Sequence, residues 1–230
     1  MLRVATYNVR GLRDSVPALI RVIESMRADV LCLQEAPRFL NWRGRRRELA
    51  EACGLRVAAG GRLGGVAVLA RPGIEVPAAE HHALKVFLGL EIRGLAVAIL
   101  RVEGVPLAVG SIHLDLHRAA RLRHAYEAMT LMRRAARAYG AAIVIGGDFN
   151  EQETEPTWRY LAGQLADCHP AAPRGDGLTF PARGPRERID AVFAERGLTV
   201  VSCGGADASE ADLGAATDHL PVLAELRVGP

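Results

Sequence analysis

The stretch that decides the fold is Ala141-Ala-Ile-Val-Ile-Gly-Gly-Asp-Phe-Asn150. Its first five residues form an unbroken apolar run, which predicts a strand over residues 141–145 that is buried on both faces. Two glycines follow, and Asp148 and Asn150 then come where this strand meets a loop. The stretch therefore predicts a buried strand that carries an acid and an amide at its end.

Working outward from this strand, apolar and polar residues alternate in a way that predicts many strands and a few helices. The other strands are expected at residues 2–7, 30–33, 55–59, 66–70, 86–92, 95–102, 106–113, 188–194, 199–202 and 222–226. Helices are expected after a cap at Asp14 or Ser15, over residues 45–53 and 118–139, and from Pro156 onward.

The order of these elements distinguishes two folds. Five consecutive strands in the middle of the chain, with turns at Gly94 and Gly104, favour hairpins, whereas parallel crossovers need a helix between strands. We therefore expect an α/β (α+β) four-layer sandwich, in which two packed mixed β-sheets are flanked by helices, with residues 1–230 forming a single catalytic domain. The alternative is one doubly wound sheet.

Composition excludes several classes of protein. Half of the 230 residues are hydrophobic, so disorder is not expected, and no apolar run reaches the roughly 18 residues of a membrane span. The four cysteines are scattered singly and show no zinc spacing. We see no secretory signal and expect a cytoplasmic protein with no obligate protein partner. A net charge of +3 permits binding to a phosphate polymer without requiring it.

Polar residues recur at the ends of the predicted strands. Strand ends of packed sheets converge on one edge, so these residues can meet although the sequence separates them. Each one alone has an ordinary explanation as a turn, cap or satisfied core residue, and it is their joint pattern that indicates a site. The set comprises Asn8, Glu35, His113, Asp148, Asn150, Asp190, Asp218 and His219.

Hydrolysis of a phosphate ester explains these residue types. Mg²⁺ or Mn²⁺ needs hard oxygen ligands, and Glu35 suits that role, with Asn8 and Asp218 beside it. Asp148 suits activation of a water molecule, and Asn150 can donate a hydrogen bond to a phosphoryl oxygen. His219 and His113 can donate protons or hydrogen bonds near neutral pH. Asp190 can orient an imidazole and raise its pKa.

Six ordered motifs give the chain a specific resemblance. They are Thr6-Tyr-Asn8, Leu33-Gln-Glu35, Ser111-Ile-His113, Gly147-Asp-Phe-Asn150, Arg188-Ile-Asp190 and Thr217-Asp-His219. Together they resemble the endonuclease/exonuclease/phosphatase superfamily of metal-dependent phosphohydrolases along nearly the whole chain. The resemblance implies a four-layer sandwich and a divalent metal held chiefly by Glu35. It also implies that Asp148 aligns the attacking water, that Asn150 and His219 stabilise the transition state, and that His113 is a second acid.

The branch of the superfamily stays open. Arg10, two residues after the first Asn, resembles the pancreatic-type deoxyribonucleases, in which this arginine contacts DNA, and it departs from the abasic-site repair enzymes. However, the strand expected to supply a Glu partner for the histidine, residues 64–71, contains none. Thr179 stands where relatives often place a threonine near the phosphate. A basic cluster at Arg43 to Arg47 either grips a phosphate backbone or forms a solvated helix face.

Three functions remain in competition. The first is a metal-dependent phosphodiester hydrolase, a nuclease acting on DNA or RNA through direct attack of an activated water. The second is a phosphatase or phosphodiesterase acting on a small-molecule or lipid-headgroup phosphate ester, which the short chain and modest charge favour. The third is a binding module that kept the fold and lost catalysis, which the apparently complete set of site residues argues against.

Overall fold

The computed structural model describes residues 1–229 and contains two β-sheets packed face to face. The seven-stranded sheet has the order β10-β12-β13-β1-β2-β4-β3. Its strands, in chain order, are β1 (Leu2–Asn8), β2 (Val30–Gln34), β3 (Arg56–Gly60), β4 (Ala67–Ala70), β10 (Pro173–Arg174), β12 (Thr199–Gly204) and β13 (Val222–Arg227). β1 pairs with β2 in parallel and with β13 in antiparallel orientation, so the sheet is mixed.

The six-stranded sheet has the order β5-β6-β7-β8-β11-β9 and is also mixed. Its strands are β5 (Glu75–Ala83), β6 (Gly94–Val102), β7 (Val105–His113), β8 (Ala142–Asp148), β9 (Ala166–Asp167) and β11 (Asp190–Ala194). The parallel pair β7 and β8 is joined by the long helix α3 (Arg118–Tyr139), as a parallel connection requires. Gly140 ends that helix with a left-handed φ of 60°.

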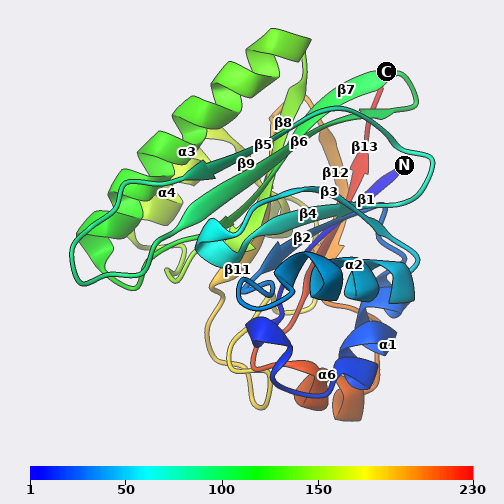
Figure 1. Cartoon of the computed structure of the whole chain (residues 1–230). Helices are drawn as coiled ribbons and strands as arrows, with labels where there is room; N and C mark the ends of the chain where they lie inside the picture. The colour runs from blue at the N-terminus through cyan, green and yellow to red at the C-terminus, as the bar shows by residue number, and fades with distance from the viewer. Residues whose placement is uncertain (230) are drawn as a thin grey trace.

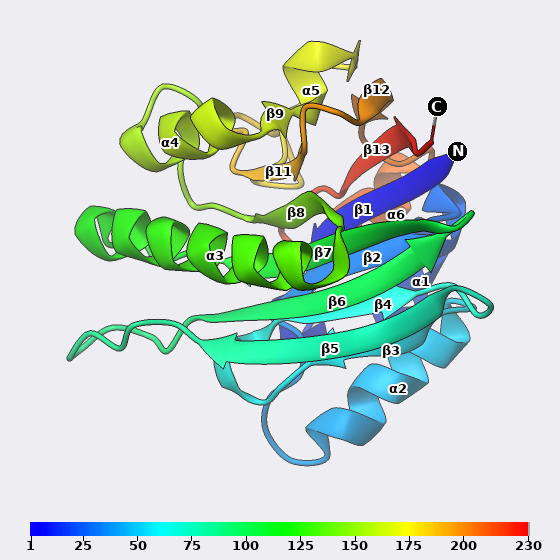
Figure 2. The same cartoon turned by 90° about the horizontal axis from the view of Figure 1, so that it is seen from above.

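Helices cover the outer face of each sheet, as Figures 1 and 2 show. The helices α3 and α4 (Pro156–Gln164) pack on the six-stranded sheet, and α1 (Val16–Met26), α2 (Trp42–Ala52) and α6 (Glu210–Ala216) pack on the seven-stranded sheet. Short pieces complete the chain: α5 (Cys168–Ala171) and the 3₁₀ turns η1 (Arg10–Leu12) and η2 (Leu63–Gly65). The expected four-layer sandwich is therefore confirmed, and the single doubly wound sheet is excluded.

Burial explains why the two sheets hold together. A central cluster joins residues of both sheets, among them Val4 and Val30 from one and Val109 and Val144 from the other, all completely buried. Separate apolar clusters lie between each sheet and its own helices. The unbroken apolar run of β8 follows from this arrangement, because its alternate side chains enter the central cluster and the cluster under α3.

One predicted strand is wrong. Residues 86–92 form a loop between β5 and β6, although their apolar side chains suggested a strand. Gly89 has a φ of 80°, and Leu88 is fully exposed and Val86 largely exposed, so this segment buries too little to pair with a sheet. The strand before it is β5, which was missed because its side chains are mostly exposed or half-buried. Pro77 lies at the irregular register of β5 on β6, as expected for an edge strand.

The helix α6 was also missed from the sequence. Ser209 caps it by accepting a hydrogen bond from the backbone N–H of Asp212, but only Ala216 of its seven residues is buried. Its apolar stripe is therefore too short to show as a helical period. Among residues 1–229, no helix combines the length and the apolar character needed to cross a lipid bilayer.

Candidate active site

Strand register brings three of the predicted residues together in the six-stranded sheet. His113 is opposite Asp148 in the parallel pair of β7 and β8, and Asp148 is opposite Asp190 in the antiparallel pair of β8 and β11. All three side chains are buried, with 5% exposure or less. One row across three strands therefore carries an imidazole and two carboxylates.

The other sheet contributes Asn8 and Glu35 from the ends of β1 and β2. The Asn8 amide donates hydrogen bonds to Asp148 Oδ2 at 2.9 Å and to Glu35 Oε1 at 3.2 Å. Asn8 therefore joins the two sheets at the site. Its own oxygen accepts a hydrogen bond from the backbone N–H of Arg10 at 3.0 Å, so in this arrangement Asn8 presents nitrogen, not oxygen, to the acids.

The backbone of Glu35 is held in an unusual conformation. Its φ is 49°, in the left-handed region that costs a non-glycine residue free energy. Hydrogen bonds on both sides stabilise it: its carbonyl accepts from Gly11 N–H at 2.9 Å, and Ala36 N–H donates to Gly65 at 2.7 Å. This turn directs the Glu35 carboxylate to the two clefts at this end of the sandwich.

His219 and Asp190 form the clearest charged pair. His219 Nδ1 lies 2.9 Å from Asp190 Oδ2, and His219 Nε2 lies 3.7 Å from Asp148 Oδ2. Burial disfavours the charged imidazole, but the negative charge of Asp190 and the hydrogen bond to it outweigh burial and raise the pKa of His219 to about 9. His219 is therefore an imidazolium at neutral pH, with its Nε2–H directed to the acids.

His113 has the opposite electrostatics. Burial, opposed by Asp148 and assisted by the charge of Arg93, lowers the pKa of His113 to about 4. Its Nε2 lies 3.1 Å from the Asn150 amide nitrogen, which identifies this ring nitrogen as a hydrogen-bond acceptor. The same Nε2 lies 3.4 Å from Asp148 Oδ2. His113 is thus neutral near pH 7, and its expected role as a second acid stays a prediction.

Asp148 lies at the centre of these contacts. Its Oδ2 accepts from Asn8, and its Oδ1 accepts from the backbone N–H of Asn150 at 3.0 Å. Burial raises the pKa of Asp148 above its ordinary value, although the neighbouring histidines oppose this effect. The Asn150 amide has both hydrogens engaged, by His113 and by the Leu114 carbonyl at 3.1 Å. It must release one of them to donate to a phosphoryl oxygen.

One group of residues and one separate carboxylate could hold a metal ion. Asp148, Asp190 and His219 offer ligand atoms that all lie within 4.8 Å of one another, but His219 Nδ1 is already bonded to Asp190. The Glu35 carboxylate instead opens on both clefts and is a hard oxygen donor. Asp190 Oδ1 is buried and finds no hydrogen-bond partner among residues 1–229. The oxygen donors at this end suit Mg²⁺ or Mn²⁺ better than a thiol-binding metal.

Three predicted residues make contacts that differ from their expected roles. Asp218, expected beside the metal, pairs with Arg10 Nε at 3.1 Å, and Arg10 also lies 3.4 Å from Asp14. Thr179, expected near the phosphate, is buried, and its hydroxyl accepts from the backbone N–H groups of Ile189 and Asp190, both at 3.2 Å. Thr179 therefore fixes the start of β11 and so the position of Asp190.

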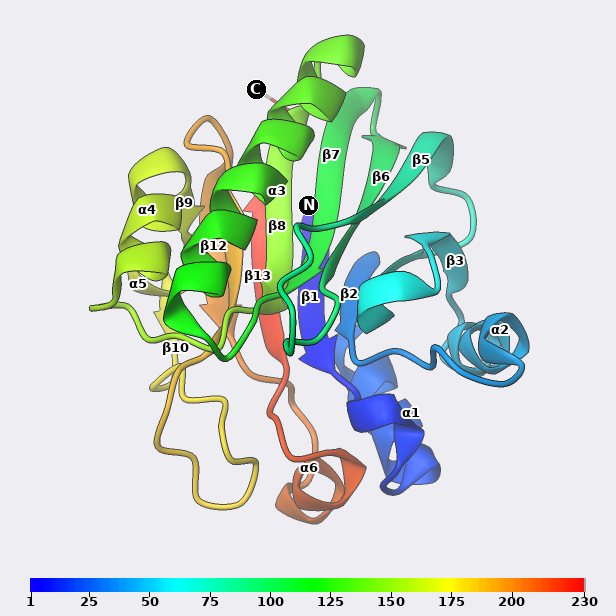
Figure 3. The same cartoon turned by 60° about the vertical axis from the view of Figure 1, so that its left-hand side comes forward.

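Two adjoining clefts open on these residues. We call the first the reaction cleft; it measures about 510 Å³ and is bordered by Glu35, Asp148, Asn150 and His219. We call the second the arginine cleft; it measures about 430 Å³ and is lined in part by Arg13, Arg38, Arg45 and Arg93. Glu35, Glu91, Arg93 and His113 line both. Figure 3 shows the loop after β2 and the loop between β5 and β6 at the end of the sandwich where β1 points.

Sequence reasoning missed the arginines of these clefts. Arg93 and Arg121 are 6% exposed, and both line the reaction cleft. In a chain with 29 basic residues, a single arginine carries no spacing signal that separates it from the rest. The basic cluster that was singled out behaves differently: Arg46 is buried and donates to the carbonyls of Pro37, Gly61 and Val66. It supports the loop after β2 from within.

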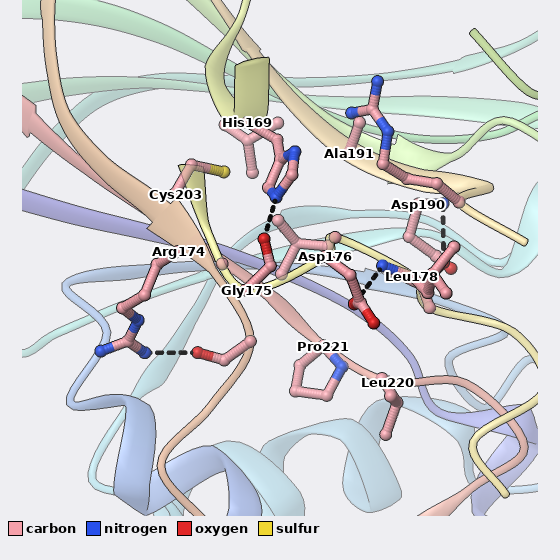
Figure 4. A pocket seen from close by; sticks show the side chains of 17 residues that line it. His169, Arg174, Gly175, Asp176, Leu178, Asp190, Ala191, Cys203, Leu220 and Pro221 are labelled. Carbon is pink, nitrogen blue, oxygen red and sulfur yellow. Dashed lines mark hydrogen bonds between the residues drawn. The ribbon is translucent and has the colours of Figure 1, made fainter. Parts of the chain in front are cut away.

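A smaller cavity of about 130 Å³ lies on another side of Asp190, as Figure 4 shows. Its polar groups are engaged with one another: His169 with the Gly175 carbonyl at 3.3 Å, Arg174 with the Gly205 carbonyl at 2.6 Å, and the Leu178 N–H with Asp176 at 3.0 Å. These bonds stabilise the loop before β11. The cavity is not part of the reaction cleft.

The fold and the acid–imidazole site define a class of phosphoester hydrolase with a two-sheet sandwich. The chain belongs to the Endonuclease/Exonuclease/phosphatase family, whose model matches residues 5–219. No match was found among curated proteins.

Solved structures share this fold at low identity. A mannosyl-6-phosphatase from Bacteroides thetaiotaomicron is 20% identical, with a TM-score of 0.82 over 99% of this chain and 100% of that chain. The human Nocturnin catalytic domain with a bound sulfate anion is 14% identical, with a TM-score of 0.76 over 98% and 94%. A truncated Caenorhabditis elegans TDP2 is 18% identical, with a TM-score of 0.72 over 99% and 97%. At these identities the likeness concerns the fold alone.

Proposed function

We propose that this protein is a metal-dependent phosphodiester hydrolase, a nuclease that cleaves by direct attack of an activated water. The observation that carries the proposal is the position of Asp148, which is held by Asn8 and lies between the neutral His113 and the charged His219. A buried carboxylate with a raised pKa is a better proton acceptor than an exposed one. A cationic imidazole beside it can neutralise charge that develops on a phosphoryl oxygen.

Each residue then has one role. Asp148 orients the water and takes its proton while the water oxygen forms the new bond to phosphorus and the bond to the leaving alcohol breaks. His219, held by Asp190, donates from Nε2 to a phosphoryl oxygen. Glu35 is the residue best placed to hold Mg²⁺ or Mn²⁺, and that cation supplies charge neutralisation when bound. Asn8 acts beside this cation by holding Glu35 and Asp148, and Asp218 acts there by holding Arg10. Arg10 and Asn150 then contact the substrate.

A second candidate is hydrolysis of a small phosphate ester. The arginine cleft favours it, because Arg93 is buried within a bounded space of about 430 Å³, which suits a compact anion. In the basic cluster at Arg43 to Arg47, which lies within α2, all the arginines except Arg46 are instead exposed, as on a solvated helix face. A binding module without catalysis is disfavoured, because the acids and imidazoles of the six motifs are present and converge at one end of the sandwich.

Nicking of supercoiled plasmid by the purified protein with Mg²⁺ or Mn²⁺ tests the proposal. We expect nicking that needs the metal and disappears in the Asp148→Asn variant, which also excludes a contaminating nuclease. Absence of nicking, together with metal-dependent phosphate release from small esters, would favour the second candidate. Absence of both from folded, metal-supplied protein would overturn the proposal.

A further inference from the structure

One carboxylate joins two arginines beside the reaction cleft. Glu91 Oε1 accepts a hydrogen bond from Arg38 Nη2 at 2.7 Å, and Glu91 Oε2 lies 3.3 Å from Arg93 Nη1. The three residues come from the loop after β2 and from the loop between β5 and β6. Two guanidinium groups that converge on one pair of oxygens form the arrangement that recognises phosphate in many proteins.

Arg93 is held from behind by a second carboxylate. Its side chain is 6% exposed, and its Nε pairs with the buried Asp115 Oδ2 at 3.6 Å, on the other side from Glu91. Arg93 lines the arginine cleft and the reaction cleft alike. Asp115 thus fixes the guanidinium, while Nη1 faces the exposed Glu91 and can accept another anion in its place.

The charge of the arginine cleft also favours binding of an anion. Arg13, Arg38, Arg45 and Arg93 line it, against two carboxylates, those of Glu35 and Glu91. Partial burial acts to raise the pKa of Glu91, but the hydrogen bond from Arg38 and the charges of Arg38, Arg93 and Arg13 lower it overall. Arg93 and Arg38 also act on His113, so the cluster lies within electrostatic reach of the reaction cleft.

Among the described residues, Glu91 is held only by these two arginines. Its side chain is 54% exposed, and the loop that carries it is outside both sheets. Displacing this carboxylate would therefore disturb no buried packing. The Arg38 guanidinium lies 5.4 Å from the ring centre of Phe39, which is 68% exposed and also lines the cleft. This cation–π contact favours the same position of Arg38 whether or not Glu91 is bound to it.

We propose that Arg38 and Arg93 bind a second phosphate of the substrate, and that Glu91 occupies its place until the substrate arrives. The inference rests on the proposed function, because it names the substrate class of the same site: esters that carry another phosphate near the one that is cleaved. That phosphate has two possible sources, the neighbouring phosphate of a nucleic-acid strand or the second phosphate of a small bisphosphate.

Two substrate pairs separate these sources. The first pair is a sugar bisphosphate and the matching sugar monophosphate, and the second is a thymidine dinucleotide with and without a terminal phosphate. For each pair the quantity of interest is the ratio of kcat/KM with and without the second phosphate, measured with Mn²⁺. A charge-assisted hydrogen bond is worth about 1.5–3 kcal/mol, so we expect a ratio of about tenfold or more in at least one pair. The pair that shows it identifies the source.

Substitutions in the cluster of Arg38, Glu91 and Arg93 test whether it causes this ratio of kcat/KM values. Arg38→Gln should lower it by about fivefold or more, mainly through KM, because one of the two guanidinium groups is lost. Glu91→Gln should raise it by a few-fold, because the competing charge is removed. Arg101→Gln and Glu75→Gln are matched controls, since this pair on β6 and β5 is 48% and 64% exposed and lines neither cleft, and both should keep the wild-type ratio. A ratio near one in both pairs, or one unchanged by Arg38→Gln, would overturn the inference.

Failure of the proposed function would be visible separately. If none of the four compounds is hydrolysed, calorimetric binding of the sugar bisphosphate and monophosphate decides the matter. Tighter binding of the bisphosphate that Arg38→Gln abolishes would support the phosphate site in the absence of hydrolysis. Equal binding of the two compounds would overturn it.

Discussion

At the residue scale, the site is organised by two histidines with opposite charge states. His219 is kept cationic by Asp190, whereas His113 is kept neutral by burial and by nearby arginines. A sequence shows only that both are histidines, so it assigned proton donation to both. The structure separates them, because Asp190 stands behind His219 while the Asn150 amide faces His113. The two substitutions should therefore have different consequences.

His219→Ala should reduce kcat by about a hundredfold or more, since it removes the charged donor that faces the phosphoryl oxygens. His113→Ala should reduce it less, because a neutral acceptor bonded to Asn150 contributes mainly to positioning. Steady-state kinetics of both variants on one ester at neutral pH measure the difference. Equal losses, or a greater loss for His113→Ala, would refute this division of roles.

Glu35→Gln should raise the metal concentration needed for half-maximal activity by about tenfold or more, because a neutral amide binds Mg²⁺ far more weakly than a carboxylate. Glu51→Gln is the matched control, since Glu51 is an exposed acid on α2. The measurement is a Mg²⁺ titration of hydrolysis. Overlapping titration curves for wild type and Glu35→Gln would show that the ion is held elsewhere, with the Asp148, Asp190 and His219 group as the first place to look.

At the element scale, β7, β8 and β11 place the acids, and the close contact between β7 and β8 depends on glycine. A Cβ added at Gly147 would lie 2.5 Å from the Ile112 carbonyl oxygen, a contact that requires the strands to shift. The neighbouring residue is Asp148, so any shift of β8 moves the central carboxylate. The two glycines before Asp148 thus connect the packing of the sheet to the site.

Gly147→Ala should destabilise the protein by about 2 kcal/mol and reduce activity, because the added methyl group overpacks the β7–β8 pair. Gly163→Ala in α4 is the control: nothing lies within 4 Å of a Cβ there, so no loss is expected. Urea unfolding of both variants gives the two stabilities. A Gly147→Ala variant as stable as wild type would contradict the packing argument.

The strands and loops also differ in how well the sequence predicts them. The strands that carry Asn8, Glu35, His113, Asp148 and Asp190 have strong apolar patterns and were found. Residues 86–92 have an equally apolar pattern but lie in an exposed loop, because β5 takes the place beside β6. A local sequence pattern does not show which of two segments pairs with a strand. The sequence also did not indicate the cluster of Arg38, Glu91 and Arg93. These residues come from two loops far apart in the sequence, and only the folded structure brings them into contact.

At the scale of the whole molecule, the stability of the metal-free protein should depend on His219. Its pKa is raised from 6.5 to about 9 by folding, so protonation favours the folded state. This contribution is fully present below pH 6.5 and is lost as the pH rises through about 9. With chelator present, the free energy of unfolding should fall by roughly 2–3 kcal/mol over that window.

Urea unfolding of wild type and His219→Gln at a series of pH values measures this effect. The variant should show a flatter profile over the same window, because its amide does not titrate. A wild-type profile that is already flat, or one that rises with pH, would contradict the charge state assigned to His219.

The central claim is that the acids gathered by the two sheets hydrolyse phosphate esters, with Asp148 as the proton acceptor. The most direct measurement is the metal-dependent hydrolysis of bis(p-nitrophenyl) phosphate by wild type, Asp148→Asn and the control Asp207→Asn, whose side chain is 83% exposed and pairs with Arg174. We predict activity that requires Mg²⁺ or Mn²⁺, survives in Asp207→Asn and falls by about a thousandfold or more in Asp148→Asn. Full activity in folded Asp148→Asn protein would contradict the account.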